Sequence, residues 1–175
     1  MDLPSPPKNP AWTETDRLAE LNAYEIVHTG PEAEFDAIVR EAAALTGTPV
    51  SLITLLTEDH QWFKAAVGTS ITGTARAISF CTHAIEQHET MVVNDAASDP
   101  RFAENPLVTS APHIRFYAGV PLHTDKGLPL GTLCVIGQKP QELTVLQQSA
   151  LEALAAKVLD LLEMRKARLQ ETKVA

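Results

Sequence analysis

Apolar residues recur at intervals of three and four in the segment 32–45, the spacing that places side chains on one face of a helix. This spacing predicts a helix whose single apolar stripe covers a sheet, and Gly47 is expected to end it. The stripe consists of Phe35, Ile38, Val39, Ala42 and Leu45. A shorter helix is predicted before it, capped by Thr15 or Asp16 and ended by Gly30-Pro31.

A long final helix is predicted to follow Thr144, which can cap it. One line of apolar positions suits either packing on a sheet or a coiled-coil seam, although arginines at 165 and 168 would weaken the seam. This line consists of Leu151, Leu154, Val158 and Leu161. A second line, Ala155, Leu162 and Leu169, would let the helix serve the core and a dimer separately.

Runs rich in β-branched and aromatic residues predict the strands of a sheet between these helices. The run 50–56 is apolar at nearly every position, as in a central strand covered on both faces. The remaining runs are 61–67, expected as its hairpin partner, 91–93, and the antiparallel pair 115–122 and 130–136. Residues 69–79 are expected to form a loop, Ser79 to cap a short helix over 80–87, and Asp99-Pro100 to start another.

Length and charge restrict the classes of protein that this chain can represent. Its 175 residues suit one domain, expected over 15–170, preceded by a flexible proline-rich arm over 1–14. A formal net charge of −8 argues against a nucleic-acid partner. No apolar run approaches the length of a membrane span, and the start lacks the pattern of a signal peptide. A cytoplasmic protein without membrane contact is therefore expected.

Four ordered motifs connect the sequence with a known family. They are Phe80-Cys81-Thr82-His83-Ala84-Ile85, Asp95-Ala96-Ala97-Ser98-Asp99-Pro100-Arg101-Phe102, Ile114-Arg115-Phe116-Tyr117-Ala118-Gly119-Val120-Pro121-Leu122 and Leu130-Gly131-Thr132-Leu133-Cys134-Val135-Ile136. Together with Gln61-Trp62-Phe63-Lys64 and the closing helix, they resemble a bacterial GAF domain over residues 20–165. The resemblance implies an α/β (α+β) fold, with a GAF/PAS-like central antiparallel sheet of five to six strands and long N- and C-terminal helices.

The resemblance also implies a ligand pocket between the sheet and the helices and loops of segment 80–115. The residues expected near that space are Phe80, Cys81, His83, Asp95, Phe102, Arg115 and Tyr117. The planar fork of Arg115 could bind a carboxylate or phosphate, but Asp95 or Asp99 could equally pair with Arg101 or Arg115 and brace the loop. Tyr117 could offer its hydroxyl to a ligand or fill the core.

The two cysteines raise the question of thiol chemistry. Free methionine-(R)-sulfoxide reductases, which are relatives with a GAF fold, use closely spaced cysteines, whereas Cys81 and Cys134 lie 53 positions apart. Cys134 is expected to be buried and inert within an apolar strand. Cys81 and His83 would lie about 200° apart around a helix, so no catalytic pair and no metal site are predicted. A bilin-type Cys-His pair and a cyclic-nucleotide signature are not found.

These observations predict a regulatory GAF domain that is not an enzyme, that senses an unidentified small molecule, and that signals through a partner chain. A homodimer through the terminal helices is expected, with a histidine kinase or a cyclic-di-nucleotide signalling protein as the partner. The cofactor is unknown. The alternative is a ligand-free dimerisation module, and a pocket packed solidly by Phe80, Phe102, Phe116 and Tyr117 would favour it.

Overall fold

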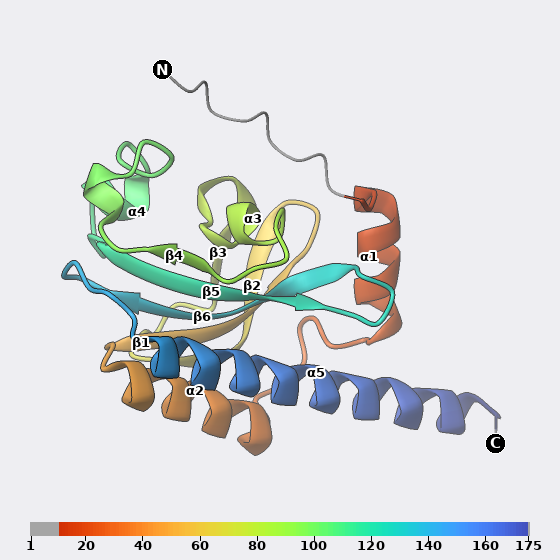
Figure 1. Cartoon of the computed structure of the whole chain (residues 1–175). Helices are drawn as coiled ribbons and strands as arrows, with labels where there is room; N and C mark the ends of the chain where they lie inside the picture. The colour runs from red at the N-terminus through yellow and green to blue at the C-terminus, as the bar shows by residue number, and fades with distance from the viewer. Residues whose placement is uncertain (1–10, 175) are drawn as a thin grey trace.

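A six-stranded antiparallel sheet forms the centre of the computed structural model, which describes residues 11–174 (Figure 1). Its strands are β1 (Val50–Leu56), β2 (His60–Val67), β3 (Gly73–Ala75), β4 (Met91–Val93), β5 (Phe116–His123) and β6 (Pro129–Gly137). Their order across the sheet is β3-β2-β1-β6-β5-β4. The prediction of a mixed fold with five to six antiparallel strands is confirmed, and the run 50–56 is a central strand.

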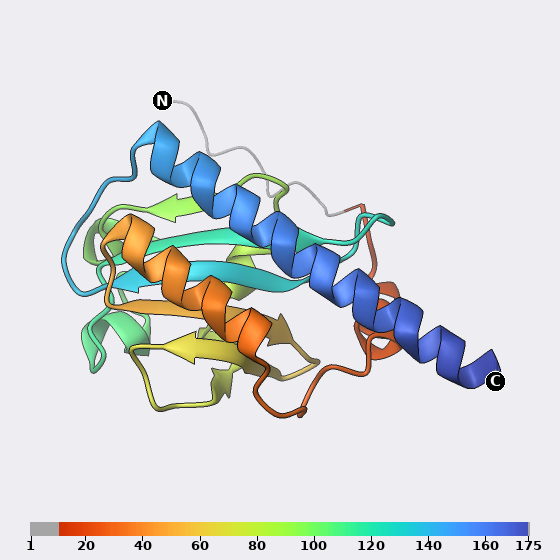
Figure 2. The ribbon, with the colours of Figure 1, turned by 90° about the horizontal axis from the view of Figure 1, so that it is seen from below.

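Helices cover both faces of this sheet. They are α1 (Glu14–Ala23), α2 (Ala33–Thr46), α3 (Cys81–Ala84), α4 (Pro106–Thr109) and α5 (Val145–Val174), with short 3-10 turns η1 (Arg76–Ile78) and η2 (Ala96–Ser98). Figures 1 and 2 show α2 and α5 side by side on one face, α3 and α4 on the other, and α1 at one end. None of the helices in residues 11–174 is long and apolar enough to cross a membrane.

The alternation of side chains along the strands divides the core between these two faces. On β1, Ile53 and Leu55 pack toward α2 and α5, whereas Leu52 and Leu56 pack toward α3. On β5, Phe116 belongs to the first cluster and Tyr117 to the second. Phe116 therefore cannot fill a pocket under α3, as the sequence analysis had considered.

The helix α5 packs against the sheet over its first half and extends beyond it (Figure 2). Ala155 and Leu162 are buried in the same core cluster as Leu151, Leu154 and Val158. The two apolar lines of the sequence thus form a single core face, so Ala155 and Leu162 do not form a separate dimer stripe. Thr144 caps the helix as predicted, since its hydroxyl accepts a hydrogen bond from the Gln147 N–H at 3.1 Å.

Several predicted boundaries are wrong for local reasons. Thr13, rather than Thr15 or Asp16, caps α1, since its hydroxyl accepts the Asp16 N–H at 3.1 Å. The helix ends at Ala23, before Gly30-Pro31, because Glu25 adopts a φ of 48°. Gly47 ends α2 in the expected left-handed conformation, with a φ of 66°.

The segments around the predicted pocket also differ from expectation. Asp99 starts no helix; its carboxylate binds the Arg101 backbone N–H at 2.9 Å and the guanidinium at 2.8 Å. The helical start falls instead at Asn105-Pro106, which begins α4. Ser79 accepts the Thr82 N–H at 3.2 Å as expected, but α3 is shorter than the predicted 80–87. The predicted loop 69–79 contains β3 and η1, which are too short to give a sequence pattern.

A buried arginine attaches α1 to the sheet. The Arg17 guanidinium is inaccessible to solvent and donates to the Leu56 carbonyl at 2.7 Å and the Pro129 carbonyl at 3.2 Å. Its charge is balanced by Glu14, 2.9 Å away, which also pairs with Arg76 before α3. Burial alone would raise the pKa of Glu14, but hydrogen bonds from Arg17 and Arg76 lower it to about 2 from an ordinary 4.5.

We expect Glu14→Gln to lower the stability of the protein by about 1–2 kcal/mol at pH 7, because the buried Arg17 charge loses its partner while Glu14 is partly exposed. A pKa below the unfolded value means that the stabilisation is complete above pH 4.5 and is lost as the pH falls toward 2. Urea unfolding of both proteins across this range measures the difference, with the exposed carboxylate variant Glu58→Gln as the control. A gap that stayed constant down to pH 2 would contradict the assignment.

Candidate functional site

Aromatic rings fill the space beneath α3. Phe80 and Phe102 stack with centroids 4.1 Å apart and an angle of 8° between the rings, and Tyr117 lies 5.2 Å from Phe80. All three side chains are buried. This packing occupies much of the volume in which a ligand was expected from the sequence.

A chain of thiols and hydroxyls lies against these rings. The Cys81 sulfur is 3.2 Å from the Tyr117 hydroxyl and 3.1 Å from the Thr132 hydroxyl, which in turn lies 3.0 Å from that of Thr54. Gly119 makes room for this arrangement, because a Cβ on it would lie 2.2 Å from the Tyr117 hydroxyl. The polar groups of these four side chains therefore satisfy one another.

The surroundings of Cys81 and Cys134 give these two thiols different pKa values. Burial alone would raise the pKa of Cys81, but hydrogen bonds from Cys134, Thr132, Thr54 and Tyr117 outweigh it and lower the pKa to about 7. Burial and the neighbouring Cys81 raise the pKa of Cys134 well above its ordinary value. Cys81 is thus the thiol that ionises first.

Two connected hollows lie on this face of the sheet. The inner cavity, of about 20 Å³, is lined by Phe80, Cys81, Tyr117 and Cys134 together with five residues that it shares with the outer hollow. The outer hollow, which we call the apolar pocket, has a volume of about 200 Å³ and lies between β1, β2, β6 and segment 107–114. The shared residues are Leu52, Gln61, Leu107, Ile114 and Ile136.

Gln61 lies at the junction of the two hollows, and only one end of its side-chain amide forms a hydrogen bond. The side chain is 5% exposed, and its Nε2 donates to the Thr74 hydroxyl at 3.1 Å. Its Oε1 has no hydrogen-bond partner. Within residues 11–174 only Glu32 Oε2 shares this lack, and that oxygen lies 2.5 Å from the Lys64 ammonium. Gln61 Oε1 is thus a buried acceptor without a donor, on a residue that lines both hollows.

The structure distributes the seven predicted site residues over three environments. Phe80, Cys81 and Tyr117 line the inner cavity, and Phe102 lies behind Phe80. His83 is exposed and meets the Phe102 ring edge-on, with centroids 4.9 Å apart.

The remaining two predicted site residues, Asp95 and Arg115, hold loops in place. Asp95 caps η2, accepting the Ala97 N–H at 3.2 Å. Arg115 donates to the carbonyls of Val108 and Ile114, both at 2.9 Å, rather than to an aspartate. Neither residue lines the inner cavity or the apolar pocket.

The residues that the two hollows share were not among the site residues predicted from the sequence. Gln61 appeared only as part of a family motif, and its strand also contains His60 and Lys64, so the sequence did not single it out as a buried polar residue. Leu107 and Ile114 carried no signal, because their approach to β1 and β6 depends on the path of a loop.

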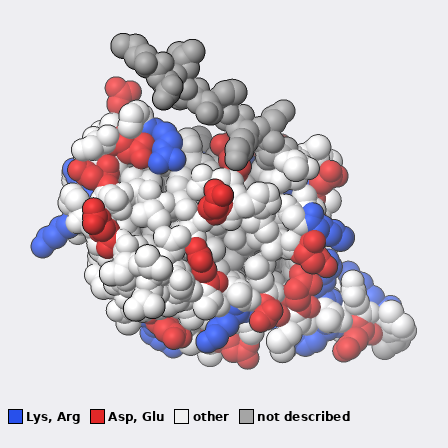
Figure 3. Space-filling model, viewed as in Figure 1, with Lys and Arg blue, Asp and Glu red and all other residues white. Residues whose placement is uncertain are grey.

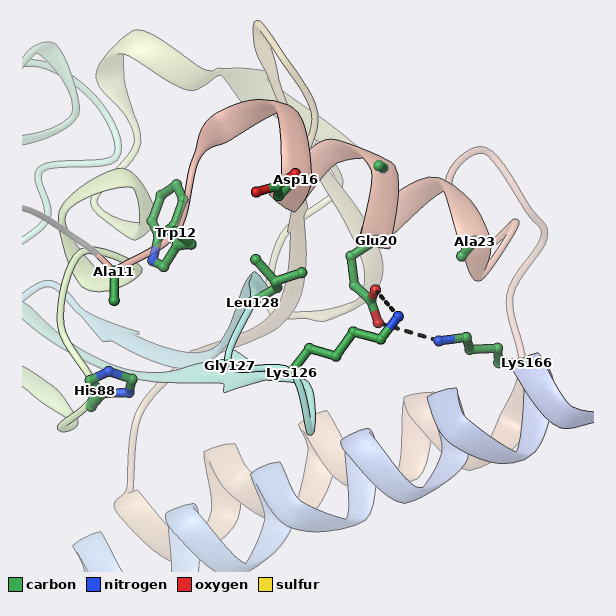
Figure 4. A pocket seen from close by; sticks show the side chains of 11 residues that line it. Ala11, Trp12, Asp16, Glu20, Ala23, His88, Lys126, Gly127, Leu128 and Lys166 are labelled. Atoms are coloured by element: carbon green, nitrogen blue, oxygen red, sulfur yellow. Dashed lines mark hydrogen bonds and ion pairs between the residues drawn. The ribbon is translucent and has the colours of Figure 1, made fainter.

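A larger open groove, of about 670 Å³, lies between α1, α5 and the turn before β6 (Figure 4). Glu20 of α1 is 5% exposed, and its two carboxylate oxygens accept from Lys126 and Lys166, both at 3.3 Å. Trp12 stands at the other end of the groove. The charged groups of this groove thus connect α1 with α5 and leave no free buried partner for a ligand.

The surface charge agrees with the acidic composition. On the face that Figure 3 shows, acidic side chains are spread widely and the basic ones do not gather into a continuous patch. Phosphate backbones are bound by clustered basic side chains. This face therefore offers no footprint for a nucleic acid.

A six-stranded antiparallel sheet with two long helices on one face and short helices over a small hollow on the other is the α+β arrangement that the sequence motifs predicted. The chain belongs to the GAF family, since the GAF domain model matches residues 30–159.

Known proteins resemble the chain in sequence and in fold. A cyclic di-GMP phosphodiesterase of Pseudomonas aeruginosa is 42% identical over 128 residues, which are 73% of this chain and 22% of the relative. The chain therefore spans about a fifth of the length of that relative.

Two solved structures illustrate the likeness of fold. The GAF domain of an Acinetobacter phosphoenolpyruvate-protein phosphotransferase is 20% identical with a TM-score of 0.64, covering 89% of this chain and 97% of that one. A type II free methionine-R-sulfoxide reductase of Thermoplasma acidophilum is 16% identical with a TM-score of 0.61, covering 75% and 92%. At these identities the likeness concerns the fold alone.

We expect Tyr117→Phe to raise the pKa of Cys81 above about 7, because the thiolate loses one of its hydrogen-bond donors. Thiolate absorbance followed against pH measures this value, with Cys81→Ser identifying which thiol titrates. An unchanged pKa in the variant would show that the Tyr117 hydroxyl does not stabilise the thiolate.

Proposed function

We propose that this GAF domain is a regulatory sensor that binds a small uncharged molecule in the apolar pocket and signals through α5 to a partner. The observation that supports this proposal is the unpartnered Oε1 of Gln61, buried at the junction of the pocket and the inner cavity. A buried acceptor without a donor costs about 1–3 kcal/mol. A ligand that brings a donor to this oxygen removes that cost and gains specificity from it.

The lining of the apolar pocket restricts the class of ligand. None of the described residues around it carries a charge. A phosphate or carboxylate buried there would lack a cation, and the desolvation of an unpaired charge is far more costly than that of an amide. The volume of about 200 Å³ is also below that of sites for drug-sized molecules. A cyclic dinucleotide therefore does not suit this pocket, whereas a small neutral molecule with one hydrogen-bond donor does.

The chain that follows the pocket offers a route for the signal. Gln138 lines the pocket directly after β6, and its amide donates to the Pro112 carbonyl at 2.8 Å. A few residues later, Gln141 Nε2 donates to the Thr46 carbonyl at 2.7 Å and Gln147 Nε2 to the Leu45 carbonyl at 3.2 Å. The start of α5 is thus fixed to the end of α2, so a shift of the β6 end can change how these helices pack.

The partner proposed for this signal is an enzyme of cyclic-di-nucleotide metabolism. The support is the 42% identity with part of a cyclic di-GMP phosphodiesterase, which far exceeds the identities of the structural neighbours described above. A histidine kinase is the alternative partner from the sequence analysis. In either case the GAF domain is proposed to regulate and not to catalyse.

Phenol is a neutral probe with one hydrogen-bond donor, and anisole is a similar molecule without that donor. We expect the preference of the apolar pocket for phenol over anisole to be greater in the wild type than in Gln61→Leu. The ratio of the two affinities is expected to fall about tenfold in the variant, the value of one hydrogen bond of about 1.4 kcal/mol. Two-dimensional NMR titration of wild type and variant measures both affinities. Comparing the ratios cancels the greater hydrophobicity of anisole.

Gln138→Leu is the matched control, because it removes an amide at the exposed end of the same pocket. The affinity ratio should be unchanged in that protein. Phenol should also alter hydrogen exchange in residues 144–170. Absence of phenol shifts around the pocket would contradict the proposed ligand class, and binding without any change in α5 would contradict the relay.

A ligand-free dimerisation module is the second candidate function. The stack of Phe80 on Phe102 and an inner cavity of only about 20 Å³ favour it, because the volume beneath α3 is largely filled. On α5, Leu146 and Met164 are exposed by 82% and 55% and lie on the side of the helix away from the sheet. Exposed apolar side chains on one side of a helix suit contact with a second copy.

We expect the protein to form a dimer that Leu146→Glu with Met164→Glu dissociates, because buried carboxylates at the interface would repel and lose water. Sedimentation equilibrium measures the dimer constant. The control is Thr109→Glu with Ser110→Glu, which adds the same charge to exposed positions at α4 on the opposite face. A wild-type protein that is monomeric at high concentration would exclude both the dimer and this candidate.

A further inference from the structure

The fold brings the two cysteines of the chain to one small cavity. Cys81 lies in α3 and Cys134 in β6, and both sulfurs are buried at the wall of the inner cavity. Both are free thiols, and both line the same cavity of about 20 Å³. Two thiols on the wall of one cavity of this size are neighbours in space, which is the first requirement for a disulfide.

The inner cavity gives a small molecule a place beside these thiols. Its volume of about 20 Å³ is close to the space that one water molecule occupies. The cavity shares Leu52, Gln61 and Leu107 among its walls with the apolar pocket, so the two hollows adjoin and the pocket is the route proposed for a molecule from solvent. The free Oε1 of Gln61 can accept a hydrogen bond from a molecule that arrives there.

The two thiols also differ in pKa, so that one of them reacts first with an oxidant. The pKa of Cys81 is lowered to about 7 by its ring of hydrogen-bond donors, while that of Cys134 is raised well above its ordinary value. The thiolate is the nucleophile of sulfur chemistry. Cys81 is therefore the attacking sulfur, and Cys134 keeps its proton until it resolves the product.

We propose that Cys81 and Cys134 form an oxidation site for hydrogen peroxide, reached through the apolar pocket and closed to larger oxidants. This inference goes beyond the proposed function, because it requires no other ligand. It also differs from the expectation that Cys134 is inert, which considered burial without the neighbour that the fold supplies.

The reaction proceeds in two steps. The Cys81 thiolate attacks one oxygen of the peroxide, an S–O bond forms as the O–O bond breaks, and the departing hydroxide takes a proton to become water. The sulfur is oxidised by two electrons and the peroxide is reduced. Cys134 then attacks the sulfur of the Cys81 sulfenic acid, losing its own proton; the S–S bond forms, the S–O bond breaks, and a second water leaves.

Intact-mass analysis and thiol counting after denaturation test this proposal on the full chain, reduced and then treated with hydrogen peroxide. The wild type should lose both thiols together and become lighter by two hydrogen atoms. Cys134→Ser should stop at a sulfenic acid that dimedone traps, because its resolving thiol is missing. Cys81→Ser should resist the peroxide, because the remaining thiol is largely protonated.

The size of the oxidant and the width of the path provide two further tests. Glutathione disulfide, which is far larger than the inner cavity, should leave the folded wild type reduced. Leu107→Ala removes part of the wall between the pocket and the cavity, and should speed oxidation by peroxide several-fold. Leu128→Ala, a partly buried leucine beside the open groove, is the matched control and should keep the wild-type rate.

Four results would overturn the proposal. One is a wild type whose thiols survive peroxide under conditions that oxidise free glutathione. A second is disulfide-linked dimers on a non-reducing gel in place of an internal bond. A third is equal reaction with peroxide and glutathione disulfide, which would show that the thiols react through local unfolding. The fourth is an unchanged rate in Leu107→Ala, provided that circular dichroism shows this variant to be folded.

Discussion

The fold depends on burying both faces of the central strands at the same time. β1, β5 and β6 have almost no exposed residues, and each fully buried aliphatic side chain contributes about 1.5–3 kcal/mol. Such a sheet needs a cover on each side. The long helices α2 and α5 provide a large continuous cover on one face, while the other is closed by α3, α4 and loops, which pack less regularly. The hollows arise on this second face for that reason.

Polar atoms inside this second layer determine what the domain can do. Cys81, Tyr117 and Thr132 satisfy one another in a closed set, whereas Gln61 retains a free acceptor. A satisfied set stabilises the packing, and a free group can recognise a molecule. The proposed ligand site and the proposed oxidation site thus adjoin and share part of their walls. An effector that enters the pocket and an oxidant that reaches the thiols would compete for the same path.

The sequence predicted most elements wherever the periodicity was long. The stripe of α2, the central run of β1 and the cap of α5 were all assigned from residue patterns, because those segments repeat their environment over several turns or residue pairs. Asp99-Pro100 and Asn105-Pro106 carry the same local signal, and only the second begins a helix. The Asp99 carboxylate binds Arg101 instead of starting a helix. The local sequence does not show which of the two sites begins the helix.

The sequence by itself determined the GAF family, the antiparallel sheet and the residues that pack beneath α3, because motifs and periodicity are properties of neighbouring positions. The tertiary structure decided which polar groups lack a partner. It placed Gln61 at the junction of two hollows and left Asp95 and Arg115 bracing loops. It also brought Cys81 and Cys134, 53 positions apart in the chain, to the wall of one cavity. Such contacts depend on the crossing of α3 over β6 and on the path of segment 107–114, and no spacing within the sequence records either of them.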